Sequence, residues 1–186
     1  VAASGEPIYR GRLSAGEIED RLASCWRPYH TAASCWRPYH TALSMLVEQT
    51  YSTFGGALLF DAHSMPSTAS SVGAREQRVD FVLGDNHGEA CAPEFIDCAE
   101  HFLARHGLRV HRNQPYAGGF STHRYGRPHL GRHALQIEIN RGLYMDENRH
   151  EKLPAFASIQ GLMTELVDEL ARLSLQLLSA SRLAAE

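Results

Sequence analysis

Short apolar runs alternate with amphipathic segments along most of this 186-residue chain, and this alternation limits the possible folds more than any other feature. Residues 57–61, 79–83, 108–111 and 133–140 are predicted strands, because they are short, mainly apolar and bounded by glycine or loop residues. Residues 93–106 and the segment from Leu153 onward carry apolar side chains at helical spacing. This order predicts an α/β fold in one domain, 1–186, with a mixed, mostly parallel sheet and helices on both faces.

A perfect tandem repeat interrupts the N-terminal part, where ASCWRPYHTA stands at 23–32 and again at 33–42. Before it, Ser14 and Glu17 form a capping box, which predicts a helix after residues 1–13. Pro28 is expected to end or kink that helix, and Pro38 to open a second one that runs to about Thr53. Ten extra helical residues would rotate the next face by roughly 80°. We therefore expect one copy to bulge out or to add surface helix.

The second helix is predicted to turn three apolar side chains inward, namely Leu43, Leu46 and Val47. The segment 113–131, rich in glycine, is predicted to be a long loop. Such a loop inside a compact domain is usually functional or disordered.

Composition and missing motifs exclude several classes of protein. The net charge of −3 argues against a nucleic-acid-binding surface, and no apolar run approaches the roughly 20 residues of a membrane span. Nucleotide-binding and serine-hydrolase motifs are absent. The sparse cysteines favour a reducing, cytoplasmic setting, whereas the 11 histidines favour metal or acid–base chemistry. The oligomeric state is not indicated.

The predicted strand 133–140 alternates cleanly, so that Gln136, Glu138 and Asn140 share one face. A central strand of an α/β sheet is normally apolar on both sides, and a carboxylate there needs a partner, a metal or a catalytic role. The alternative is an edge strand whose polar side faces water. The strand alone does not decide between the two.

Asp61 and His63 stand where the first predicted strand ends, and their spacing sends both side chains to one side. The ends of such strands are where open α/β sheets bind ligands. A carboxylate can hold the imidazole so that its other nitrogen binds a metal. The alternative is a hydrogen-bonded pair without a metal. Likewise, Arg78 and Asp80 form either part of a site or a structural ion pair.

Six segments, taken together, resemble the N-formylglutamate amidohydrolase family. They are Pro7-Ile-Tyr9, Pro38-Tyr-His40, DAHSMP at 61–66, RVDFVLGD with Gly88 at 78–88, NQPYAGGFSTHRYG at 113–126, and HALQIEINRGLYMDE at 133–147. The combination of DAHSMP with HALQIEINRGLYMDE is specific. The resemblance implies a zinc-dependent hydrolase with a fold related to the zinc carboxypeptidases (phosphorylase/hydrolase-like). The implied reaction splits N-formyl-L-glutamate into formate and L-glutamate, a late step of bacterial histidine degradation.

The resemblance also implies roles for individual residues. His63 is the expected zinc ligand, with Asp61 behind it, and Glu138 is the expected general base. Because family members begin well upstream of Pro7, the other zinc ligands are expected upstream of Val1 and the fold is expected to be incomplete at its N-terminus.

The remaining candidates for the site follow from motif position. Arg78, Arg124 and Arg141 are candidates for binding the substrate carboxylate, and Asn113 is a further candidate for substrate binding. Tyr125 or His123 is expected to stabilise the oxyanion. Two alternatives stay open for the function, which are a related zinc-dependent N-acyl amino acid hydrolase and an inactive, truncated homologue.

Overall fold

The computed structural model describes residues 15–21, 27–70 and 79–183. The chain divides into two compact units, Val1–Leu46 and Val47–Glu186. The described part of the first unit is helical, with α1 at Ala15–Arg21 and most of α2, which spans Arg27–Phe54. The second unit holds the sheet and all of the later helices.

Helix α1 confirms the helix expected after the capping box, although Ser14 lies outside the described residues. The predicted boundaries in the repeat are wrong, because α2 begins at Arg27 and continues through Pro38. Pro28 falls in the first turn of α2, where a missing N–H costs no helical hydrogen bond. The second copy adds exposed helix from Cys35 to Tyr39. Leu46, predicted to point inward, is 60% exposed, whereas Leu43 and Val47 are half-buried.

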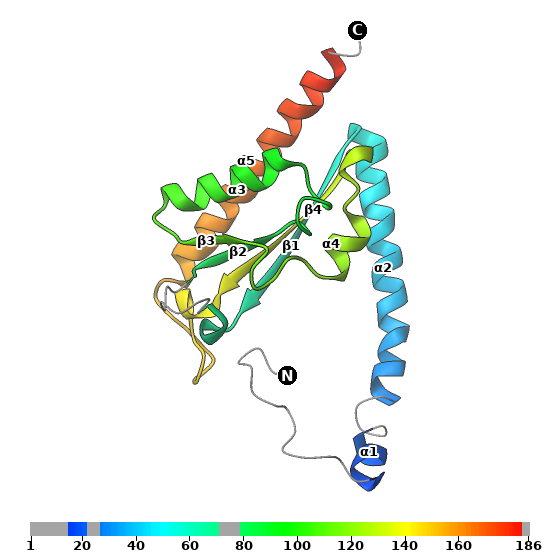
Figure 1. The fold of residues 1–186 in the computed structure, drawn as a ribbon, viewed down its shortest axis with the longest axis vertical. Helices are drawn as coiled ribbons and strands as arrows, with labels where there is room; N and C mark the ends of the chain where they lie inside the picture. Colours follow the sequence, from blue (N-terminus) through cyan, green and yellow to red (C-terminus); the bar gives the residue numbers. More distant parts are fainter. Residues whose placement is uncertain (1–14, 22–26, 71–78, 184–186) are drawn as a thin grey trace. The chain divides into compact units, whose positions relative to one another are not determined.

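Four strands form the main sheet of the second unit in the order β1-β4-β2-β3 (Figure 1). They are β1 at Ala57–Met65, β2 at Phe81–Gly84, β3 at Val110–Arg112 and β4 at Arg132–Asn140. The pairs β1–β4 and β2–β3 are parallel, and β2 pairs antiparallel with β4. The sheet is therefore mixed, as predicted. Strand β4 lies between two neighbours, so the edge-strand alternative for residues 133–140 is wrong.

Helices cover both faces of this sheet. Helix α3 (Pro93–Arg105) and helix α5 (Phe156–Leu183) pack on one face, where Leu135 and Ile137 of β4 are fully buried. The short helix α4 (Phe120–Tyr125) contacts β4 and β1, and Gly119 at its start binds Gln136 on the opposite face. Among the described residues, no helix is both long and apolar enough to cross a membrane.

Several short elements were not predicted. The segment 113–131 is no continuous loop, since it contains α4 and a 3₁₀ turn at Pro128–Leu130. Further 3₁₀ turns lie at Ser67–Ser70 and Arg141–Leu143. A small hairpin pairs β5 (Met145–Asp146) with β6 (Glu151–Lys152). These pieces are too short for a periodic pattern to reveal them.

Substitutions of two leucines of α5 test the position of the hydrophobic core. Leu170 is 2% exposed in the core cluster, whereas Leu175 is 61% exposed. We expect Leu170→Ala to lower the free energy of unfolding by about 2–5 kcal/mol, because it leaves a cavity. The matched change Leu175→Ala should cost less than about 1 kcal/mol. Urea unfolding followed by circular dichroism measures both values, and equal losses would contradict this placement of the core.

Candidate active site

The side chains of a polar patch share one face of β1 and β4. The parallel register sets Asp61 beside Gln136, His63 beside Glu138 and Met65 beside Asn140. Residues two apart in a strand point the same way, so all six side chains lie on the face that α4 covers. The predicted partners Glu138 and His63 are thus adjacent, near the carboxyl ends of two parallel strands, where ligands bind in open α/β sheets.

Asp61 holds the imidazole of His63. Its Oδ1 lies 3.1 Å from Nε2 of His63, and the histidine side chain is 50% exposed while that of Asp61 is 18% exposed. The predicted Asp61–His63 pair is therefore present. The contact fixes the ring orientation and directs Nδ1 away from the aspartate, which is how a carboxylate orients a histidine for a metal or for proton transfer.

Glu138 is a carboxylate buried in the middle of the sheet, with 7% of its surface exposed. Burial raises the pKa of its carboxyl group above the ordinary value, and the negative charge of Asp61 raises it further. The charges of His63 and Arg141 and the hydrogen bond from Gln136 oppose this shift. A buried carboxyl group with a raised pKa is typical of an acid–base catalyst.

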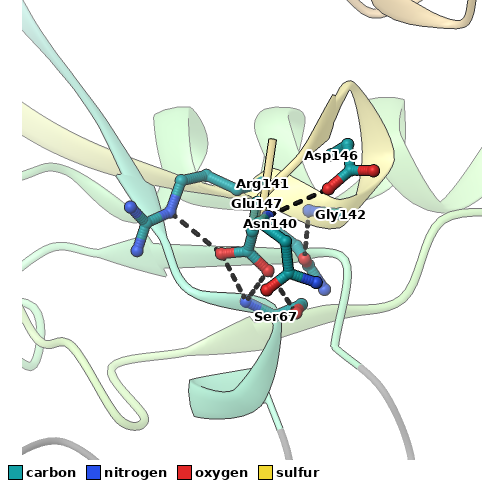
Figure 2. Close-up of polar contacts among 7 residues, drawn as sticks. Ser67, Asn140, Arg141, Gly142, Asp146 and Glu147 are labelled. Atoms are coloured by element: carbon teal, nitrogen blue, oxygen red, sulfur yellow. Dashed lines mark hydrogen bonds and ion pairs between the residues drawn. The ribbon is translucent and has the colours of Figure 1, made fainter. Parts of the chain in front are cut away.

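Arg141 follows the end of β4 and forms an ion pair with Glu147, as Figure 2 shows. Its Nε lies 3.3 Å from Oε1 of Glu147, while the terminal nitrogens of the guanidinium point away from that carboxylate. The backbone N–H of Ser67 donates to both carboxylate oxygens of Glu147, at 3.3 and 3.1 Å, and the Ser67 hydroxyl donates to Oε2. The cluster thus ties the segment after β1 to the segment after β4.

Asn140, also shown in Figure 2, stabilises this turn from the buried end of β4. Its Oδ1 accepts a hydrogen bond from the backbone N–H of Gly142 at 2.9 Å, and its Nδ2 donates to the carbonyl of Val79 at 2.9 Å. Asn140 is fully buried. The arginine that follows it is therefore presented from a fixed backbone.

Three of the four residues predicted on the segment 113–126 to act near the substrate lie on α4, namely His123, Arg124 and Tyr125. Tyr125 is 7% exposed, whereas His123 and Arg124 are exposed. Nδ1 of His123 lies 3.4 Å from Nδ2 of Asn86, and the Arg124 guanidinium lies over the rings of Phe120 and Tyr125. The structure thus brings α4 to the polar face of the sheet, where it contacts β4 and β1.

Asn113 directly follows β3 and binds the loop that follows β2. Its Nδ2 donates to Oδ1 of Asp85 at 2.8 Å, and its Oδ1 accepts from the backbone N–H groups of Asp85 and His87 at 3.1 and 3.3 Å. Both ends of this amide are therefore used within the loop. Arg78 lies outside the described residues, and Asp80 accepts from the backbone N–H of Arg109 at 3.0 Å.

The described residues do not complete a metal site. No group of three His, Cys, Asp or Glu side chains in the described ranges converges as metal ligands would. His63 with Asp61 supplies one oriented imidazole, whereas a catalytic zinc normally has three protein ligands. The residues present therefore fit one part of a zinc site and not the whole.

Two residues of the site, Ser67 and Glu147, were missed by sequence reasoning. Each lies inside or directly after a motif that was singled out, but their contact joins positions 80 residues apart. No local pattern predicts such a long-range pair. For Gln136, which contacts Glu138 and Gly119, the sequence indicated only a place on the polar face of its strand.

A buried carboxylate beside a carboxylate-oriented histidine, at the ends of parallel strands of an α/β sheet, is an arrangement suited to acid–base chemistry in an enzyme. The family model for N-formylglutamate amidohydrolase matches residues 31–145. The chain therefore belongs to the N-formylglutamate amidohydrolase family. The match begins just before the second copy of the repeat and therefore includes that copy in full.

Known proteins agree with this membership. The chain is 34% identical over 146 residues to the N-formylglutamate deformylase of Pseudomonas aeruginosa and 35% identical over 150 residues to that of Pseudomonas putida. Each alignment covers 77% of this chain and 51% of the relative, so the chain spans about half the length of these curated relatives.

Solved structures show the same fold. An N-formylglutamate amidohydrolase from Ralstonia eutropha superposes with a TM-score of 0.62 at 35% identity, covering 96% of this chain and 59% of that one. A gene product of Agrobacterium tumefaciens gives 0.52 at 20% identity, covering 86% and 56%, and supports the fold alone.

The raised pKa of Glu138 predicts a pH-dependent effect on stability. Because the folded state keeps the proton to higher pH than the unfolded chain, this group makes stability fall as pH rises through the interval between the two pKa values. Glu138→Gln removes that loss, so the variant should be more stable than the wild type near pH 7 and the difference should shrink towards about pH 4. Urea unfolding at both pH values tests this, with the exposed Glu165→Gln as control. A wild type that is the more stable of the two at pH 7 would contradict it.

Proposed function

We propose that this chain carries the hydrolytic site of an N-formylglutamate deformylase, which converts N-formyl-L-glutamate and water into formate and L-glutamate in histidine degradation. The observation that carries the proposal is the buried Glu138 on the central strand β4, adjacent to the Asp61-oriented His63. Membership of the family supports the substrate class. The names of the Pseudomonas relatives support the reaction.

In the proposed reaction, Glu138 accepts a proton from the attacking water. The water oxygen bonds to the formyl carbon, and the carbon–nitrogen bond then breaks. Glu138 returns the proton to the leaving amine, so the carboxylate is regenerated. A carboxyl group whose pKa is raised by burial suits both transfers, because it is a stronger base than an ordinary glutamate and is still able to give the proton back.

Of the two candidate arginines that the structure describes, Arg124 and Arg141, Arg141 is the better placed to bind the substrate carboxylate. Glu147 holds its Nε side, and the terminal guanidinium nitrogens point away from that contact in Figure 2. Its charge also acts on Glu138, which sets the two groups within electrostatic range. A guanidinium with two N–H groups available matches a carboxylate in a bidentate fashion.

We further propose that the active protein depends on zinc and that His63 is one of its ligands. Zinc supplies Lewis acidity toward the formyl oxygen and toward water. Since the described residues do not complete a ligand set, the other ligands are proposed to lie outside them.

Replacing the proposed base tests the mechanism. We expect Glu138→Gln to lower kcat for N-formyl-L-glutamate by about a hundredfold or more, because general acid–base catalysis is worth that much. Formate release measures the rate, and Glu165→Gln on the exposed side of α5 is the matched control. Undiminished turnover in Glu138→Gln would exclude this role. Comparison of formyl with acetyl donors separates a deformylase from a broader N-acyl hydrolase, since pocket size decides between them.

The role of Arg141 predicts a change in KM. Arg141→Ala should raise KM for N-formyl-L-glutamate by about tenfold or more, because a charge-assisted bidentate contact is lost. The exposed Arg172→Ala on α5 should leave KM unchanged. A neutral analogue with both carboxylates amidated should show no difference between wild type and Arg141→Ala. The same loss with both substrates would contradict carboxylate recognition.

Zinc binding is predicted to depend on His63. We expect His63→Ala to weaken zinc binding by about tenfold or more in competition with a chromogenic chelator, because one ligand is lost. The exposed His101→Ala on α3 serves as the control, since α3 covers the other face of the sheet. Equal zinc affinities for His63→Ala and the wild type would rule out His63 as a ligand.

A further inference from the structure

Gln136 is a buried polar side chain that the proposed reaction does not use. It lies on the central strand β4, on the same face as Glu138, and is 4% exposed. Its Nε2 donates a hydrogen bond to Oε1 of Glu138 at 3.0 Å. Its Oε1 accepts one from the backbone N–H of Gly119 at 2.6 Å. The amide therefore joins the start of α4 to the proposed base.

These two partners fix which end of the amide faces Glu138. The backbone N–H of Gly119 can only donate, so it needs the oxygen of Gln136. A carboxylate can only accept, so it needs the nitrogen. If the amide were flipped, two donors would face each other at Gly119 and two acceptors at Glu138, and buried groups would be left unsatisfied. The hydrogen-bonding needs of Gly119 and Glu138 thus determine the orientation of the Gln136 amide.

The hydrogen bond from Gln136 holds Oε1 of Glu138 and does not involve Oε2. A carboxylate held at Oε1 cannot rotate freely, so the direction of Oε2 is fixed as well. Proton transfer in the transition state depends on such a fixed geometry. A buried charge also needs a hydrogen-bond donor, and Gln136 supplies one.

We propose that Gln136 is a positioning residue that fixes the carboxylate of Glu138 and couples it, through Gly119, to the segment that leads into α4. This inference rests on the proposed function, in which Glu138 is the base. Gly119 adds to it, because a Cβ at that position would lie 3.2 Å from Oε1 of Gln136 and would press on the amide.

Two substitutions of Gln136 separate positioning from packing. Gln136→Glu keeps an acceptor for Gly119 but replaces the donor toward Glu138 with oxygen. Gln136→Met keeps the length and removes both hydrogen bonds. We expect each to lower kcat by about ten- to a hundredfold, as loss of an orienting partner typically does, with KM for N-formyl-L-glutamate changed by less than about threefold. Gln160→Glu, exposed on α5, makes the same charge change away from the site and should leave both constants unchanged.

A spectroscopic measurement tests the contact without reference to turnover. In ¹⁵N-labelled full chain, the side-chain amide signal of Gln136, assigned by its loss in Gln136→Met, should shift in Glu138→Ala and stay in place in Glu165→Ala. An unshifted signal overturns the inference, as does a kcat in both Gln136 variants within twofold of the wild type.

The outcomes also distinguish this inference from the function on which it rests. If the wild type is active and Glu138→Gln is inactive while both Gln136 variants keep full kcat, the positioning role fails and the function stands. If Glu138→Gln keeps full activity, the proposed base fails. If the wild type releases no formate, the proposed function fails for this chain, and the amide signal alone decides whether Gln136 holds Glu138.

Discussion

A carboxylate buried at the centre of a β-sheet is the constraint on which this site depends. An ionised carboxyl group loses its hydration there, and the loss is tolerated only where donors and positive charge replace the water. Around Glu138 these are the amide of Gln136 and the charges of His63 and Arg141. The compensation is incomplete, since the pKa of the carboxyl group stays above its ordinary value. Ionised Glu138 therefore lowers the free energy of unfolding, at the position where the proposed reaction needs a base.

The register of β1 against β4 and the contacts at the strand ends build the rest of the site around that carboxylate. The pairing sets His63 beside Glu138, and a slip of one residue would turn one of the two to the other face. Beyond the strands, Glu147 binds both Arg141 and Ser67, so the segments following β1 and β4 are held together. The charged groups of the site thus come from two sequence segments that meet only in the fold.

The sequence predicted the elements that have a clear periodic pattern, and it predicted the polar residues that stand within or at the end of an apolar strand. The alternation in 133–140 indicated the polar face of β4, and the spacing of Asp61 and His63 indicated their contact, both of which the structure contains. It did not predict that α2 continues through Pro38, because a proline inside a helical segment normally ends or kinks the helix. The contact of Ser67 with Glu147 could not be predicted for another reason, because it depends on the tertiary fold and not on a local sequence pattern.

Isotope labelling during a single turnover tests most directly whether Glu138 acts as a base. With excess full chain over N-formyl-L-glutamate, supplied with zinc in ¹⁸O-labelled water, a base-activated water places one labelled oxygen in formate. The peptide that contains Glu138 then keeps its unlabelled mass, because no bond forms between the carboxylate and the formyl carbon. We predict labelled formate with an unlabelled Glu138 peptide. Label in that peptide, or no formate at all, would contradict the account.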